Sequence, residues 1–171
     1  SCLEGYQEIY LMAWSMGVWV AGRTLAGSHW PLVKRLAVNG TPYPIEEEKG
    51  IPQAIFEGTL QGFSEPILVR FRRRMCGTSE GVKAFLSHAP YRPLDELKDE
   101  LAALKQAVLS EEIPAFHWDR AIVGLQDRIF PTENQLKAWE GIPVDTREIA
   151  HYDEQLFDHL LSGKEEGWTR P

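Results

Sequence analysis

The chain has 171 residues, enough for one domain with a substantial core, and its 43% apolar and 25% charged residues are ordinary for a soluble globular protein. Its formal net charge of −7 argues against non-specific nucleic-acid binding, which depends on positive charge. No apolar run approaches the roughly 20 residues that span a bilayer, and no secretory signal is visible. The two cysteines show neither a disulfide framework nor a zinc-ligand spacing, so we predict a cytoplasmic protein without a metal site.

The start of the chain predicts a strand, a helix and a second strand. Residues 8–14 contain a short apolar run without a breaker, which is typical of a buried strand. Ser15 follows at the turn, and residues 17–25 predict a helix that ends at a glycine. Residues 35–38 predict the second strand, which the turn sequence of residues 39–42 ends.

The middle of the chain predicts only helices. They span residues 51–60, 66–76, 81–86 and 94–109. In the last of these, apolar side chains recur every three or four residues and form one apolar face. Packing against the sheet explains most of these leucines. As a block inserted after the second strand, however, residues 44–114 predict a helical lid over an active site.

Strands and helices alternate again after this block. The predicted elements are strands at residues 120–125 and 144–149 and helices at residues 132–139 and 153–161. Thr132 with Gln135 forms a capping-box pattern at the start of the first of these helices. Strands that alternate with helices pair in parallel, because parallel strands need a crossover between them. We therefore predict an α/β fold with a mostly parallel sheet, built from core residues 1–43 and 115–171.

Three polar residues follow predicted strands in the order serine, aspartate, histidine. Ser15 lies between small residues in Ala-Trp-Ser-Met-Gly, which differs from the Gly-x-Ser-x-Gly of a nucleophile elbow by its alanine, and Asp127 and His151 follow later strands. Singly, they are explained as a helix cap, a turn residue and a surface histidine. Together they predict the triad of an α/β-hydrolase, since an imidazole activates the hydroxyl and a carboxylate holds the imidazole. The backbone N–H of Met16 would then be an oxyanion donor.

Two further groups of side chains are candidates for substrate binding. Trp14 and Met16 flank the serine and either line an acyl pocket or fill the core. Arg70, Arg73 and Arg74 project to one side of their helix, opposite its apolar residues. They form either an ordinary solvated face or a basic patch on the lid, suited to phosphate or to an acidic protein.

Several segments resemble BioG-type pimeloyl-[acyl-carrier protein] methyl ester esterases. They are residues 13–21, 37–41, 50–52, 56–60, 73–77, 92–96, 117–118, 127–130 and 151–152, which cover nearly the whole chain. The resemblance implies an α/β-hydrolase that cleaves the methyl ester of pimeloyl-acyl carrier protein in biotin biosynthesis and releases methanol. It implies no metal or diffusible cofactor.

The resemblance also implies roles for individual residues. Ser15 attacks the ester carbonyl, His151 accepts and then returns the proton, and Asp127 orients His151. The acyl carrier protein is acidic, which gives the arginines at positions 70, 73 and 74 a partner.

One departure from the family concerns the start of the chain. Family members carry earlier strands and a loop that supplies the second oxyanion donor, whereas this chain begins only a few residues before its first strand. We therefore expect N-terminal strands that are missing from this chain or an associated upstream piece. Two other functions stay open: a carboxylesterase of other small esters, and a non-catalytic protein that binds acyl carrier protein.

Overall fold

The computed structural model describes residues 3–165 and 168, and in that part the chain folds into one four-stranded parallel sheet and seven helices. The elements in chain order are β1 (Ile9–Trp14), α1 (Gly17–Leu25), β2 (Leu32–Val38), α2 (Gln53–Gln61), α3 (Glu65–Cys76), α4 (Ser79–His88), α5 (Leu94–Ser110), β3 (Arg120–Gly124), α6 (Thr132–Ala138), β4 (Val144–Arg147) and α7 (Glu154–Leu161). The predicted α/β class and parallel pairing are confirmed. Cys2 lies outside the described residues.

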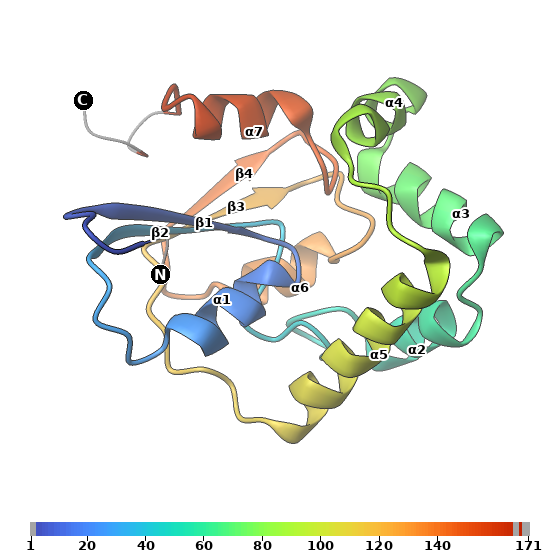
Figure 1. Ribbon diagram of the computed structural model, residues 1–171, viewed down its shortest axis with the longest axis horizontal. Coiled ribbons are helices and arrows are strands. Elements are labelled where there is room, and N and C mark those ends of the chain that lie inside the picture. The colour runs from blue at the N-terminus through green and yellow to red at the C-terminus, as the bar shows by residue number, and fades with distance from the viewer. Residues whose placement is uncertain (1–2, 166–167, 169–171) are drawn as a thin grey trace.

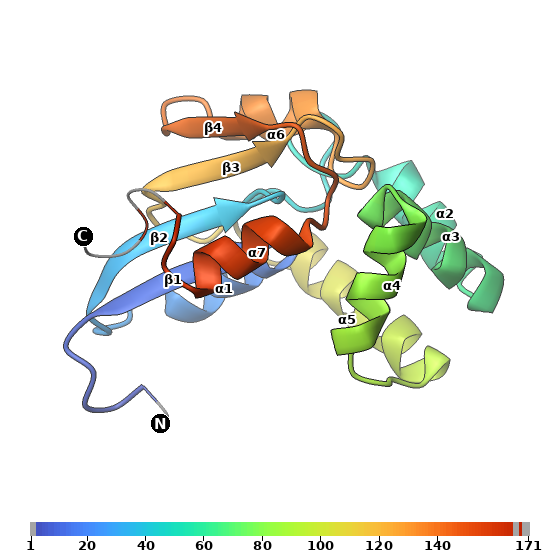
Figure 2. The same cartoon turned by 90° about the horizontal axis from the view of Figure 1, so that it is seen from above.

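The strands lie side by side in the order in which they occur in the chain, β1-β2-β3-β4 (Figure 2). The register pairs Ala13 with Ala37 and Val38 with Ile122, and all neighbouring strands are parallel. Parallel pairing brings the carboxyl ends of the strands to one edge of the sheet. The loops that follow β1, β3 and β4, where the sequence predicted its three polar residues, therefore meet at that edge.

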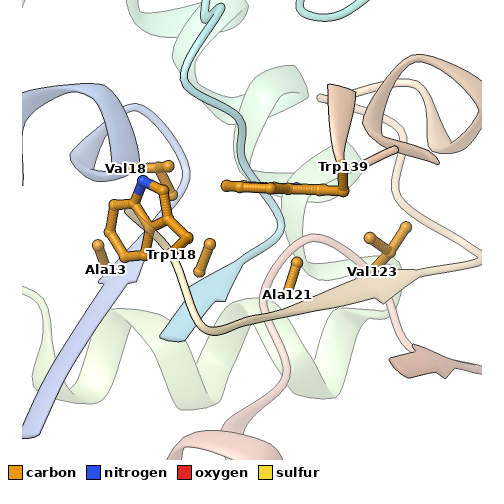
Figure 3. Close-up of a cluster of buried hydrophobic side chains, with 7 residues drawn as sticks. Ala13, Val18, Trp118, Ala121, Val123 and Trp139 are labelled. Carbon is orange, nitrogen blue, oxygen red and sulfur yellow. The ribbon is translucent and has the colours of Figure 1, made fainter. Parts of the chain in front are cut away.

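Helices cover both faces of the sheet (Figure 1). On one face, α1 and α6 enclose a cluster of alanines, valines and tryptophans from helix, strand and loop; Trp118 and Trp139 lie edge to face with their ring centroids 6.2 Å apart (Figure 3). On the other face, Leu156 and Leu160 of α7 pack on Leu36 and Ile122. The sheet is thus the middle of three layers.

Helices α2 to α5 lie beyond the carboxyl edge of the sheet in both views (Figures 1 and 2). A separate apolar cluster joins Phe56 of α2 and Met75 of α3 to Ile129 and Phe130, which follow β3. The longest of the four, α5, has 17 residues, and no helix in the described part of the chain is long and apolar enough to cross a membrane.

Two local predictions were wrong. The strand β2 begins at Leu32, before the predicted residue 35, because its first residues pair with β1 across the sheet. The capping box at the start of α6 does not form: the N-cap is Pro131, and the Thr132 hydroxyl instead donates to the Gly124 carbonyl at 2.9 Å. Gln135 also turns away from the helix end, toward the residues that follow β3. Buried acceptors at the strand ends compete successfully with the local cap.

Candidate active site

Ser15 sits in a strained turn between β1 and α1. Its φ of 59° lies in the left-handed region that a non-glycine residue rarely adopts. The Ser15 N–H donates to the Val38 carbonyl at 3.0 Å, and its own carbonyl accepts from Val18 at 3.1 Å. These bonds hold the turn, so the hydroxyl projects at the carboxyl edge of the sheet.

The close backbone contact behind this turn lies at Gly40. A Cβ at Gly40 would come within 2.2 Å of the Ser15 carbonyl oxygen, so no larger residue fits. A Cβ at Gly17 would meet nothing within 4 Å. The strand-to-helix turn therefore needs a glycine, but in the neighbouring loop after β2 and not at the flank of the serine.

His151 follows β4 and reaches the serine. Its Nε2 lies 2.9 Å from the Ser15 Oγ, and its side chain is 1% exposed. The ring stacks on Phe130 at 6.0 Å with an interplanar angle of 6° and lies 5.2 Å from the Trp14 ring. The imidazole is thus fixed between two aromatic side chains and the hydroxyl.

Asp127 completes a continuous chain of hydrogen bonds. Its Oδ2 lies 2.8 Å from the His151 Nδ1, and its Oδ1 accepts from the N–H groups of Ile129 (2.8 Å) and Phe130 (3.0 Å). A fully buried carboxylate needs such donors, because an unpaired charge is costly away from water. An ionised carboxylate only accepts, so it keeps the proton on Nδ1 and leaves Nε2 free to accept from the Ser15 hydroxyl.

Gln135 is a contact of this group that the sequence analysis did not identify. Its side chain is fully buried, and its Nε2 donates to the Asp127 Oδ2 at 3.0 Å and to the Phe130 carbonyl at 2.9 Å. It therefore holds the same carboxylate oxygen that faces His151. A glutamine one turn into a helix can point either to the core or back to the helix end. The local sequence does not distinguish these two orientations, so it could not identify the contact of Gln135 with Asp127.

An apolar cavity of about 330 Å³ opens beside Ser15. The core contributes Ser15, Met16 and Ile129 to its wall, and the rest comes from residues 51–104. These lining residues are mostly apolar: Ile51, Ile55, Phe56, Thr59, Phe63, Leu68, Phe71, Arg74, Arg92, Leu97, Glu100, Leu101 and Leu104. Such a wall suits an apolar ligand, and its charged side chains suit a polar group at one end of that ligand.

The predicted binding residues take different positions. Met16 and Arg74 line the cavity, whereas Arg70 and Arg73 lie exposed on α3, as the amphipathic pattern predicted. Trp14, predicted to bind substrate, does not line the cavity. Its Nε1 donates to the His151 carbonyl at 2.8 Å, so it fills the core behind the histidine.

Burial raises the pKa of two groups in the second hollow of the molecule. Desolvation raises the pKa of the Cys76 thiol. Desolvation also raises the pKa of Tyr152, and the negative charge of Glu154 adds a smaller contribution in the same direction. Both line a wider depression of about 680 Å³ that includes Asp127 but neither Ser15 nor His151. The apolar cavity is therefore the one that a reacting group at the serine would occupy.

The fold and the site define an α/β protein in which a serine, a histidine and an aspartate from three strand ends form one hydrogen-bonded chain beside an apolar cavity. The family described as "Pimeloyl-ACP methyl esterase BioG" matches residues 2–164, and this chain belongs to that family.

Two curated relatives match most of this chain. A Bacteroides fragilis protein named malonyl-[acyl-carrier protein] O-methyltransferase is 46% identical over 162 residues, which are 94% of this chain but 33% of that protein. An uncharacterized Haemophilus influenzae protein is 40% identical over 92% of this chain and 73% of its own. Thus the chain spans about a third of the first relative and about three quarters of the second.

Solved structures resemble the fold. The structure of BioG from Haemophilus influenzae superposes with a TM-score of 0.86 at 40% identity, covering 94% of this chain and 74% of that one. A hydrolase from Pseudomonas aeruginosa superposes with a TM-score of 0.56 at 14% identity, covering 92% of this chain and 63% of that one. The second likeness extends to the fold alone.

Proposed function

We propose that this protein is a serine esterase that hydrolyses the methyl ester of pimeloyl-acyl carrier protein to methanol and free pimeloyl-acyl carrier protein in biotin biosynthesis. One observation carries the reaction class: the Ser15 hydroxyl ends a hydrogen-bonded chain through His151 to Asp127 and also lines the apolar cavity. The family description supplies the substrate.

In the proposed reaction, the Ser15 Oγ forms a bond to the ester carbonyl carbon while the His151 Nε2 takes the proton of the Ser15 hydroxyl. The tetrahedral intermediate collapses with cleavage of the bond to the methoxy oxygen, which receives the proton from Nε2 and leaves as methanol. A water molecule, deprotonated by the same nitrogen, then attacks the acyl-serine, and Ser15 regains its proton. Asp127 holds the ring and stabilises the imidazolium in both halves.

The intermediate's negative oxygen needs hydrogen-bond donors. The Met16 N–H follows the serine at the start of α1, and among the residues that the structure describes it has no acceptor. This supports its predicted role as one oxyanion donor. Because the chain covers 74% of the Haemophilus BioG chain, we propose that the second donor lies in the part of such relatives that this chain does not match.

We propose that the architecture is an α/β-hydrolase core, residues 1–43 and 115–171, with a helical lid of residues 44–114. The order of Ser15, Asp127 and His151 after β1, β3 and β4 supports the core. The cavity supports the lid, since residues 51–104 form most of the wall of a cavity that Ser15 also lines. A cytoplasmic location stays a prediction.

The proposed partner is the acyl carrier protein that carries the ester. The acyl chain would occupy the apolar cavity with its methyl ester at Ser15. Arg70 and Arg73 would then contact the acidic carrier protein from the exposed face of α3, and Arg74 would lie where that surface meets the cavity. No cofactor is needed, because the hydroxyl, the imidazole and water supply every atom transferred.

The name of the Bacteroides relative suggests methyl transfer as a second candidate. That name applies to a protein of which the matched region is 33%. We favour hydrolysis for the matched region because Ser15 and His151 supply a nucleophile in contact with a base. Hydrolysis of a methyl ester needs these two groups. Hydrolysis of other small esters and binding of acyl carrier protein without reaction are the remaining alternatives.

A labelling experiment distinguishes these candidates. A fluorophosphonate probe should modify Ser15, and the label should disappear in Ser15→Ala but persist in Ser87→Ala, where the hydroxyl is an exposed one on α4. The same protein should release methanol from pimeloyl-acyl carrier protein methyl ester. Labelling with turnover of p-nitrophenyl acetate alone would indicate a general carboxylesterase, and an inert Ser15 would indicate a binding protein.

A further inference from the structure

We propose that Asn39 is a positioning residue for His151. Asn39 follows β2, the one strand of the described sheet whose end carries no proposed catalytic side chain, and it would hold together the ends of neighbouring strands that do carry one. The inference rests on the proposed function. The strand β2 lies between β1 and β3 in the sheet, and Asn39 is the first residue after it. The turn after β2 therefore lies at the centre of the carboxyl edge.

The Asn39 side chain bridges two other strand ends. Its Nδ2 donates to the carbonyls of Ala150 and His151, both at 3.0 Å, and its Oδ1 accepts from the Gly124 N–H at 2.6 Å. The residue is 1% exposed, so no water competes for these bonds. Its φ of 44° places it in the left-handed region, which asparagine tolerates better than most residues.

These bonds take the place of regular strand pairing between the segments that follow β3 and β4. Because β4 ends at Arg147, regular pairing with β3 stops before the histidine is reached. The His151 carbonyl instead accepts from two side chains, Asn39 at 3.0 Å and Trp14 at 2.8 Å. Buried carbonyls without partners are costly, so these donors determine where the backbone of His151 lies.

The same turn also touches the nucleophile. Gly40 packs against the Ser15 carbonyl so closely that no Cβ fits, and the Gly40 carbonyl accepts from the Trp139 Nε1 at 3.0 Å. The Asn39 N–H donates to the Ile122 carbonyl at 3.0 Å, which fixes the turn to β3. Residues 39 and 40 thus set the position of Ser15 and of His151 relative to one another.

Two substitutions at Asn39 separate the side chain from the backbone conformation. Asn39→Asp keeps an acceptor for Gly124 but turns an oxygen toward two carbonyls. Asn39→Gly removes the side chain without strain in the left-handed region. Asn134→Asp is the matched control, because the Asn134 Nδ2 also donates to two carbonyls, those of Glu47 (2.9 Å) and Gly50 (2.8 Å), without touching His151.

We expect kcat to fall by about 10²-fold in both Asn39 variants, since a misplacement of about 1 Å has that effect, while KM stays within about twofold. The rate of fluorophosphonate labelling at Ser15 should fall with kcat. Asn134→Asp should keep kcat within about twofold. The downfield NMR resonance of the proton between His151 and Asp127 should shift or broaden in the Asn39 variants only.

The proposal is overturned if a folded Asn39→Asp or Asn39→Gly variant keeps the wild-type kcat and the wild-type resonance. It is also overturned if Asn134→Asp lowers kcat as much as the Asn39 variants do, because loss of any asparagine that bridges two carbonyls would then suffice. If wild-type Ser15 is not labelled, the proposed function fails instead, and the resonance of the His151–Asp127 proton still decides whether Asn39 positions the ring.

Discussion

The carboxyl edge of the sheet and the four helices beyond it are held by different forces. At the edge, the buried side chains of Asn39, Asp127, Gln135 and His151 each form two or more hydrogen bonds. In contrast, α4 and α5 have no buried residue at all, and α2 has one, Phe56. Directional bonds fix reacting atoms, whereas apolar contacts between helices tolerate adjustment to a ligand.

The two regions meet at the end of α3. There the Tyr152 N–H donates to the Met75 carbonyl at 2.9 Å, and Gly77 lies against Ala150. The loop that carries His151 therefore contacts both regions. Substitutions at the edge should lower kcat/KM for every substrate. Substitutions on the helices should lower kcat/KM only for substrates that the helices bind.

The largest effect is expected for Asp127→Asn. An amide NH₂ toward His151 would favour the tautomer with the proton on Nε2, which cannot accept from Ser15, so kcat/KM should fall by about 10⁴-fold on all esters. Asp119→Asn is the matched control, because Asp119 also accepts a backbone N–H, that of Arg35, but precedes β3 at the opposite edge. A loss under about tenfold in Asp127→Asn would contradict the role of Asp127.

A smaller effect is expected for Gln135→Leu. The change removes one donor to Asp127 and leaves the Phe130 carbonyl unpaired. We expect about a tenfold fall in kcat and a loss of about 1–3 kcal/mol in the free energy of unfolding, measured by urea titration. Gln155→Leu on the exposed surface of α7 should change neither. Unchanged stability in Gln135→Leu would show that its hydrogen bonds contribute nothing net.

A selective effect is expected for Arg70→Glu with Arg73→Glu. If α3 binds the acidic carrier protein, kcat/KM for the protein-bound ester should fall by about tenfold or more, with weaker dependence on salt. Turnover of p-nitrophenyl acetate should not change, because neither side chain lines the cavity. Lys98→Glu with Lys137→Glu changes the net charge equally on other helices and is the control. Equal loss on both substrates would refute the docking role.

The smallest effect is expected at Asp145, far from the serine. The Arg147 hydrogen bond, followed by that of Arg120, lowers the pKa of Asp145 in the folded chain, although burial opposes it. A lowered folded pKa gives stability that is present above the unfolded value and is lost as the pH falls through the folded one. Asp145→Asn should therefore flatten the acid side of a stability–pH curve and leave activity unchanged.

Much of the fold could be predicted from local patterns. The helices of residues 44–114 and the strand β1 lie within a few residues of their predicted bounds, because apolar period and turn residues act over one or two turns of chain. The prediction of a capping box at Thr132 and Gln135 failed because it used only such local patterns. Their side chains bond to Gly124 and Asp127, acceptors that a local pattern does not include.

The sequence by itself determined the α/β alternation, the order of Ser15, Asp127 and His151, and the amphipathic face of α3. Only the tertiary structure decided that Ser15 and His151, 136 positions apart, lie 2.9 Å from one another, and that Trp14, Asn39 and Gln135 support them. Periodicity reports which face of an element is buried. Which polar atoms meet at a sheet edge depends on strand order and register, and these follow from the packing of the whole chain.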